Sequence, residues 1–253
     1  MKSWLICIDD TDDIGTKGTG EIAEEIAALL AEKHANNAEC DDKCFITRHQ
    51  LFVHPSIPYT SHNSAMCFLF KTHLSFSEIK QTCVSHLLKE SAGAADPGLA
   101  ILDMASTYNM AALIAFGQSA KVEVKTKQQA YDLAKEQGVD LTEHGGTGQG
   151  VIGALAGIGL RLSGQDGRVK GHFNLCDDAD DEPARINLSV DEIIDRTSLH
   201  AVMSVDGAVL AGHERVILSG KIKAVYCQHR FALLVNRHNE RWVNASKQLL
   251  KSY

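Results

Sequence analysis

An apolar run near the start of the chain, Trp4 to Ile8, passes without a break into the acidic stretch DDTDD at residues 9–13. Such a run predicts a short buried strand. The segment from Glu21 to His34 then repeats apolar residues at helical spacing, and its acidic first turn suits the positive end of a helix dipole. A buried strand that feeds into an amphipathic helix favours an α/β (α+β) fold.

The rest of the chain alternates between the two-residue repeat of apolar residues that is typical of strands and the 3.6-residue repeat of helices. Strands are expected in 44–54, 63–73 and 99–103, and helices in 74–91 (with Ser75 or Ser77 as N-cap) and 151–162. Residues 105–138 predict two helices around VEVKT, a strand or connector. From about Gly167 short strand-like segments recur: INLSV, HAVMSV, RVILSGKIKAVYC and FALLVNR. We therefore expect two domains, 1–166 and a smaller β-rich module at 167–253.

Charge and cysteine content limit the functional classes. The formal net charge of -7 argues against a protein whose whole surface binds nucleic acid. Of the seven cysteines only Cys40 and Cys44 lie close in sequence, which favours buried or reduced thiols over a zinc site. The chain shows no basic-then-apolar leader and no apolar run of about 18 residues. We expect a cytoplasmic protein without a membrane segment.

The acidic stretch is the first candidate site. Four carboxylates within five residues repel one another unless a cation or water screens them. Magnesium needs one or two carboxylates, completed by waters and substrate phosphates. The end of a buried strand is also the edge at which α/β sheets bind ligands. The pattern predicts a Mg2+ site at Asp9, Asp10 and Asp12, with a solvated acidic turn as the alternative.

The second candidate site is the glycine-rich stretch HGGTGQG at 144–150, which leads directly into a helix. Backbone amides at Gly145, Gly146, Gly148 and Gly150 could approach an anion at the positive helix end. No Lys-Ser/Thr pair follows, so this is not a Walker loop. The alternative is a purely structural tight turn. Together the two stretches predict that carboxylates hold a metal and the glycine loop holds the phosphates of ATP.

Other residues near these sites carry suitable chemistry. Lys17 and Gly18 lie on the loop beside the acids, where Lys17 could neutralise phosphate charge. Thr19 could bind the metal or accept a phosphoryl group, or equally serve as the helix N-cap. A proline-containing stretch further along supplies candidate substrate contacts: Arg48, Tyr59, His62 and Asn63.

Four motifs, taken in order, resemble those of the archaeal 2-agmatinylcytidine synthetases, which modify an isoleucine tRNA. They are CIDDTDD with its Gly/Thr loop, VHPSIPYTSHNSAMCFLF, ADPGLAILD and GQGVIGALAGIGLRL, spanning roughly residues 4 to 163. The resemblance implies a kinase-like domain joined to ferredoxin-like elements. It also implies that ATP is cleaved to activate a cytidine base and that the amine agmatine then displaces the phosphate.

Carried over by motif position, Asp9, Asp10 and Asp12 would be the metal-binding and catalytic carboxylates, and Thr19 would lie beside the triphosphate. The chain departs from the family pattern at Gly18, Gly20 and Gln149, where the family has cysteine, threonine and arginine. The resemblance does not extend to the family's OB-fold and zinc ribbon. Together with the acidic net charge, this argues against tRNA as a partner.

The sequence thus predicts a kinase- or ligase-like enzyme that uses Mg2+ and ATP to transfer a phosphoryl group to an unidentified small-molecule or RNA acceptor. The β-rich module would recognise substrate or mediate a homodimer. Two alternatives stay open. One is a non-catalytic nucleotide or anion sensor, which the replaced threonine and arginine favour. The other is a haloacid-dehalogenase-like phosphatase, suggested by Asp10-x-Asp12 at a strand end, although Ile14 stands where that family has threonine.

Overall fold

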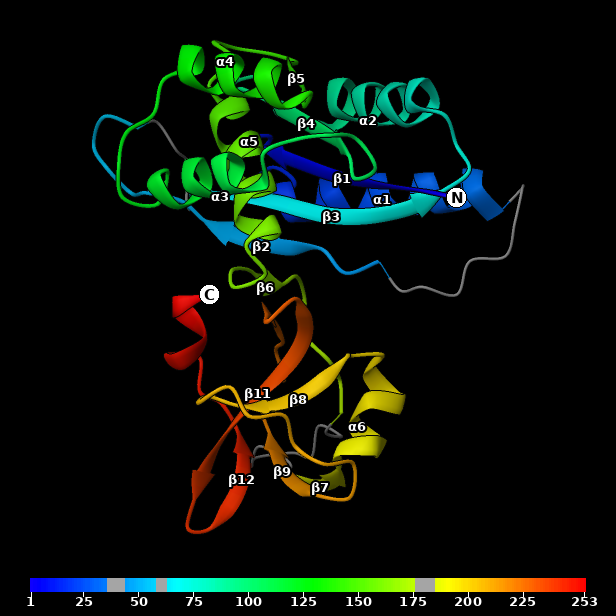
Figure 1. Ribbon diagram of the computed structural model, residues 1–253, viewed down its shortest axis with the longest axis vertical. Coiled ribbons are helices and arrows are strands. Elements are labelled where there is room, and N and C mark those ends of the chain that lie inside the picture. Colours follow the sequence, from blue (N-terminus) through cyan, green and yellow to red (C-terminus); the bar gives the residue numbers. More distant parts are fainter. Residues whose placement is uncertain (36–43, 58–62, 176–184) are drawn as a thin grey trace. The chain divides into compact units, whose positions relative to one another are not determined.

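The computed structural model describes residues 1–35, 44–57, 63–175 and 185–253. It divides the chain into two compact units, Met1–Ser163 and Gly164–Tyr253. In Figure 1 the first unit runs from blue to green and the second continues to red. The sequence predicts this boundary after residue 166, close to the one observed after Ser163.

The first unit is built on a five-stranded antiparallel sheet. Its strand order is β5-β4-β1-β3-β2. The elements are β1 (Lys2–Asp9), α1 (Thr19–Ala35), β2 (Thr47–Gln50), β3 (Ser64–Thr72), α2 (Phe76–Glu90), β4 (Gly98–Asp103), α3 (Met110–Ser119), α4 (Lys127–Gln137), β5 (Asp140–Glu143) and α5 (Gly150–Leu162). The chain order βαββαβ with β4-β1-β3-β2 in the sheet is the split βαβ arrangement of ferredoxin-like folds. The expected α/β fold class with ferredoxin-like elements is confirmed.

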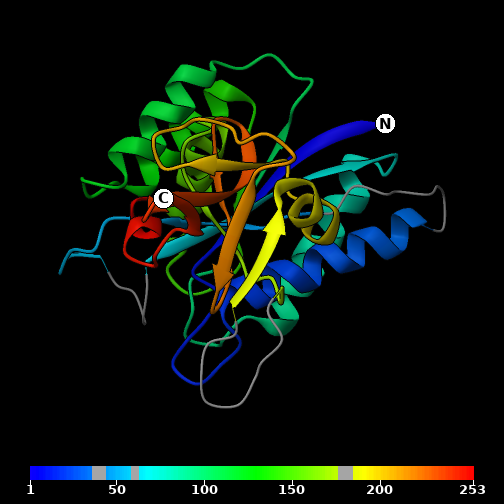
Figure 2. The same ribbon diagram turned by 90° about the horizontal axis from the view of Figure 1, so that it is seen from below.

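Helices cover both faces of this sheet (Figures 1 and 2). On β1, Trp4, Ile6 and Ile8 belong to the core shared with α1 and α2. Leu5 and Cys7 point to the opposite core, which α5 fills and α3 and α4 extend. Because successive side chains of a strand point to opposite faces, a strand buried on both sides is apolar at every position. This explains the unbroken apolar run in the sequence.

Helix α5 lies unusually close to its neighbours because it is rich in glycine. Gly153 and Gly157 face the side chains of Asp9 and Cys7 on β1, and a Cβ at either position would overlap them. Gly117 of α3 meets α5 just as closely, since a Cβ there would lie 2.7 Å from the carbonyl oxygen of Ala156. The start of α5 is therefore pressed against the end of β1.

Several boundaries differ from the expectations. Ser75, not Ser77, caps α2, in a capping box with Glu78. Residues 120–126 form a connector between α3 and α4 rather than a strand. Strand β5 was not expected, because its four residues are half-buried or exposed and show no alternation.

The second unit is rich in short strands, as expected. It contains β6 (Arg168–Val169), β7 (Arg185–Ser189), α6 (Val190–Thr197), β8 (Ala201–Ser204), β9 (Arg215–Ser219), β10 (Val225–Cys227), β11 (Arg230–His238), β12 (Arg241–Asn244) and a 3-10 turn at Leu249–Ser252. The order is β6-β10-β11-β12-β9-β7, and β8 pairs with β11. Helix α6 was not expected: the predicted strand INLSV ends at Ser189, which caps that helix.

Two further observations concern the whole described chain. The described cysteines, Cys7, Cys44, Cys67, Cys83 and Cys227, are free thiols. Among the residues that the structure describes, none of the helices has both the length and the apolar character that crossing a bilayer requires.

Candidate functional site

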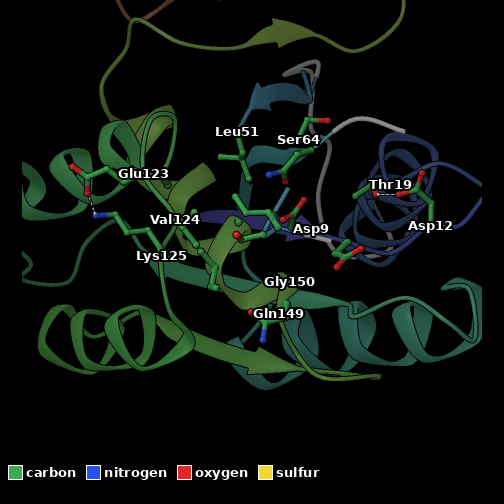
Figure 3. Close-up of a pocket in the computed structure, with 17 residues that line it drawn as sticks. Asp9, Asp12, Thr19, Leu51, Ser64, Glu123, Val124, Lys125, Gln149 and Gly150 are labelled. Atoms are coloured by element: carbon green, nitrogen blue, oxygen red, sulfur yellow. Dashed lines mark hydrogen bonds and ion pairs between the residues drawn. The ribbon is translucent and has the colours of Figure 1, made fainter. Parts of the chain in front are cut away.

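The end of β1 opens into a pocket within the first unit (Figure 3). Its empty volume, including the part open to solvent, is about 760 Å3. One wall carries Asp9, Asp10, Asp12 and Thr19. The remaining lining residues are apolar residues or glycine at seven positions and polar or charged at six: Leu51, Ser56, Ile57, Asn63, Ser64, Ala120, Glu123, Val124, Lys125, Gln149, Gly150, Ile152 and Gly153.

The antiparallel sheet explains which segments meet at this pocket. Asp9 lies opposite Gly98 of β4, and Ile8 lies opposite Met66 of β3. The carboxyl end of β1 is therefore flanked by the amino ends of its two neighbours. The sequence-based expectation used the carboxyl edge at which α/β sheets bind ligands; in this antiparallel sheet the carboxyl end of β1 shares its edge with the starts of β3 and β4. The acids still line a pocket, but the residues beside them come from the first residues of the neighbouring strands.

Asp9 and Asp10 are carboxyls in a poorly hydrated, negatively charged setting. Asp9 is 7% exposed, and burial together with the charge of Asp10 raises its pKa well above the ordinary value. Burial, then the charges of Asp96 and Asp12, raise the pKa of Asp10 to about 6. Asp10 also has a φ of 53°, an uncommon left-handed conformation for a residue other than glycine. A divalent cation would relieve this repulsion, so the oxygen donors fit such an ion.

The carboxylates do not form a closed metal cage. Among the described residues, no group of three or more His, Cys, Asp or Glu side chains is arranged to hold a metal ion. Magnesium is usually bound by one or two protein carboxylates, with waters and phosphate oxygens completing its shell. The arrangement therefore suits a metal that arrives with a phosphorylated ligand better than a resident structural ion.

Thr19 is tied to the acidic wall. It lies in the first turn of α1, and its hydroxyl donates a hydrogen bond of 2.8 Å to Asp12 Oδ1. The alternative role as N-cap is therefore not the one observed. Figure 3 shows the Thr19–Asp12 pair beside the pocket, with Asp9 next to it. The bond brings a hydroxyl and a carboxylate together, as a general base and its substrate require.

The glycine loop holds an anion, but one that belongs to the chain itself. The backbone N–H and the hydroxyl of Thr147 donate to the carboxylate of Asp96. Gly148 and Gln149 donate backbone hydrogen bonds to the same group. Burial would raise the pKa of Asp96, but these hydrogen bonds outweigh it and hold the pKa below its ordinary value. The cradle expected to hold phosphate is occupied by Asp96 in this structure.

The glycines of this loop divide between two roles. Gly150 lines the pocket, together with Gln149. Gly145, Gly146 and Gly148 are not among its lining residues; Gly146 and Gly148 have positive φ values of 54° and 74°, which shape the loop around Asp96. Of the four glycines predicted to contact phosphate, the structure thus places Gly150 at the pocket and the other three outside its lining.

Lys17 is placed differently from the prediction. Its Nζ lies 2.6 Å from Glu25 Oε1 and 2.7 Å from Glu90 Oε2, so two carboxylates share its charge. Neither Lys17 nor Gly18 is among the residues that line the pocket. Instead, Lys17 ties the loop after β1 to helices α1 and α2.

The candidate substrate residues are also split. Asn63 lines the pocket, and its side-chain amide donates to the carbonyl of Phe52 at 2.6 Å. Arg48 is not a lining residue; its Nε donates to Ser64 Oγ at 3.0 Å. Arg48 therefore contacts the pocket lining through Ser64. Tyr59 and His62 lie outside the described residues.

Several pocket residues were not anticipated. Ser64 follows a predicted substrate residue directly. Glu123, Val124 and Lys125 come from the connector between α3 and α4, whose sequence resembles a strand. Gly153 comes from α5, which the sequence predicts as a helix but not as part of the site. The Glu123–Lys125 segment can be recognised in the sequence as a connector between two helices, but nothing in its composition indicates that it lines a pocket.

Comparisons with known proteins support the fold. The sequence matches no protein-family profile and no curated protein. Among solved structures, it is similar to a complex of TiaS with an isoleucine tRNA and ATP, at a TM-score of 0.50 and 23% identity over 63% of this chain and 36% of that chain. A tRNA fluorescent labeling enzyme gives a TM-score of 0.48 and 24% identity, again over 63% and 36%.

Apo TiaS, a tRNA agmatidine synthetase, gives a TM-score of 0.47 and 23% identity over 63% of this chain and 35% of that chain. The matched region thus spans little more than a third of these proteins. The chain resembles the N-terminal part of TiaS in fold, in agreement with the resemblance drawn from the four motifs.

The raised pKa of Asp10 has a consequence for stability. Its carboxyl binds a proton more tightly in the folded protein, at about 6, than at its ordinary value of 3.8. Stability is therefore lost as the pH rises through this interval. We expect Asp10→Asn to raise the free energy of unfolding at pH 7.5 by about 1 kcal/mol, allowing for partial solvent screening. Urea unfolding should show no gain at pH 3.5, and an equal gain at both pH values would contradict the assignment.

Proposed function

We propose that the first unit binds ATP with Mg2+ in this pocket and transfers a phosphoryl group to an acceptor. The observation that carries the proposal is the gathering of Asp9, Asp10, Asp12 and Thr19 on one wall of the pocket. Crowded carboxylates are unfavourable without a cation, and nucleotide triphosphates are commonly bound together with one. A further support is the likeness in fold to a protein whose solved complex contains ATP and tRNA.

The residues of the chain would divide the work as follows. Asp10 and Asp12 would hold the metal from the mouth of the pocket, and the more buried Asp9 would fix the strand end from which they project. Bound magnesium would neutralise charge on the phosphates as the phosphoryl group leaves. The apolar wall, with Leu51, Val124 and Ile152, would exclude water from the nucleoside.

The hydroxyl of Thr19 is the one pocket hydroxyl bonded to a carboxylate of the acidic wall among the described residues. It would orient a phosphate oxygen or receive the phosphoryl group, while Asp12 accepts the hydroxyl proton. Thr19→Val would keep the shape and remove both abilities. Thr19→Ser would keep them.

Chemical reasoning identifies the class of acceptor and not the individual molecule. TiaS is a tRNA agmatidine synthetase, so a base carbonyl activated for attack by an amine is one candidate. A small molecule with an equivalent oxygen is the other, and the net charge of -7 favours it over a large polyanion. Kinase-like or ligase-like chemistry would share the same nucleotide site.

Product analysis tests the proposal. ATP would be incubated with Mg2+, mixed small amines, and either total tRNA or candidate small-molecule acceptors, and its products separated by chromatography. We expect ADP to form with wild type and Thr19→Ser, and not with Asp12→Asn or Thr19→Val, because ADP is what ATP leaves when it gives up one phosphoryl group. Bound ATP that stays intact under every acceptor would instead support the non-catalytic sensor.

A further inference from the structure

The connector between α3 and α4 forms a wall of the pocket through Ala120, Glu123, Val124 and Lys125. Of the described residues that line the pocket, Lys125 is the only one with a positive charge, against four carboxylates. A polyphosphate that enters this pocket therefore needs its own metal at the acidic wall. Any further positive charge from the chain's lining residues must come from Lys125.

Lys125 is placed so that a bound ligand could replace Glu123 as its ion-pair partner. Its Nζ lies 2.7 Å from Glu123 Oε2. The Lys125 side chain is 13% exposed, whereas that of Glu123 is 62% exposed. Figure 3 shows the pair at the side of the pocket, with Val124 between them in sequence. An ion pair with one partner in water is weak, so exchanging Glu123 for a phosphate oxygen costs little.

The neighbouring cations are already committed elsewhere. Lys17 is held by Glu25 and Glu90, as described above. Lys127 donates to Glu143 Oε2 at 2.6 Å and to the carbonyl of Thr147 at 2.7 Å. Neither residue lines the pocket. Lys127 is thus a matched control, because it lies two residues from Lys125 and carries the same charge.

We propose that Lys125 binds a phosphate group of the nucleotide and that Glu123 is the anion which the phosphate displaces. The inference rests on the proposed nucleotide site and adds the residue that takes the role first expected of Lys17. A lysine ammonium is a compact charge with three donors, which suits a phosphate oxygen. Glu123, as a competing anion near the ligand, should weaken the binding of the same phosphate.

Calorimetric titrations of full-length variants at one ionic strength test this. For Lys125→Met we expect the dissociation constant of Mg-ATP to rise about tenfold or more, the usual effect of losing one charge-assisted hydrogen bond. Lys127→Met should leave the constant within about twofold of wild type. Glu123→Gln should lower it, an effect of opposite sign. Adenosine, which lacks phosphate, should bind wild type and Lys125→Met equally.

The outcomes separate the two claims. If wild type does not bind Mg-ATP, the proposed function fails and this inference with it. If wild type binds and Lys125→Met binds equally well, only the inference fails. Equal weakening of adenosine and Mg-ATP by Lys125→Met would place the lysine at the nucleoside and overturn the phosphate assignment. Should Lys125→Met not fold, Glu123→Gln still decides, because weaker binding in that variant contradicts the proposal.

Discussion

Replacing Gly153 with alanine is expected to destabilise the first unit by about 3 kcal/mol and to remove nucleotide binding. The added Cβ would overlap the carboxylate of Asp9 and would lie 2.8 Å from Leu51 Cδ1. Both neighbours line the pocket, and Asp9 is 7% exposed, so neither can move without disturbing the wall. Urea unfolding gives the stability change and calorimetry with Mg-ATP gives the binding.

Two control variants test whether the effect of Gly153→Ala comes from its overlap with Asp9: alanine at a glycine in open space, and a second change that removes the Asp9 side chain. Gly93 has no atom within 4 Å of the position a Cβ would take, so Gly93→Ala should leave both measurements unchanged. Asp9→Ala combined with Gly153→Ala removes the overlap with the Asp9 carboxylate, and the double variant should be more stable than the sum of the two single changes predicts. Additive changes, or a Gly153→Ala protein as stable as wild type, would show that α5 does not press on Asp9.

Asp96→Ala is the second change with a large expected effect. Thr147, Gly148 and Gln149 all direct donors at this carboxylate, and these donors precede α5. Without it, these donors must turn to water, and the loop is held to the segment before β4 only by backbone hydrogen bonds such as those from His144 to Pro97 and from Gly150 to Asp96. We expect a loss of about 2 kcal/mol, because relief of the repulsion with Asp10 offsets part of the lost hydrogen bonding.

Amide hydrogen exchange locates this effect in the loop. The amides of residues 147–149 should exchange faster in Asp96→Ala, while those of β3 should not change. Asp96→Asn should fall between wild type and alanine, since its side-chain oxygen accepts and its nitrogen cannot. Unchanged protection at residues 147–149 in the alanine variant would mean that the loop holds its shape without Asp96.

The parts of the fold that were predictable are those set by local pattern. The unbroken apolar run at Trp4–Ile8 indicated a strand buried on both faces, and β1 is one. The amphipathic spacing of residues 21–34 indicated a helix, and α1 spans Thr19–Ala35. The four acids following a buried strand indicated a site, and Asp9, Asp10 and Asp12 do line a pocket.

The parts that were not predictable depend on contacts between distant segments. Lys17 pairs with Glu90, 73 residues away, and Asp96 meets Thr147, 51 residues away. No local pattern indicates either contact, so a lysine beside acids and a glycine-rich loop both resembled phosphate ligands. Lys125 was missed because its connector resembles a strand in composition, and only the packing of α3 on α5 brings it to the pocket.

One titration tests the central claim most directly: ATP binding to wild type by calorimetry, with Mg2+ and with the ion removed by EDTA, repeated for Asp10→Asn. The crowded carboxylates of Asp9, Asp10 and Asp12 should exclude a bare triphosphate and admit its magnesium complex. We therefore predict saturable binding that requires Mg2+ in wild type and is strongly weakened in Asp10→Asn. Binding that is equally tight without the ion, or absent in both conditions, would contradict the assignment of this pocket as a magnesium-nucleotide site.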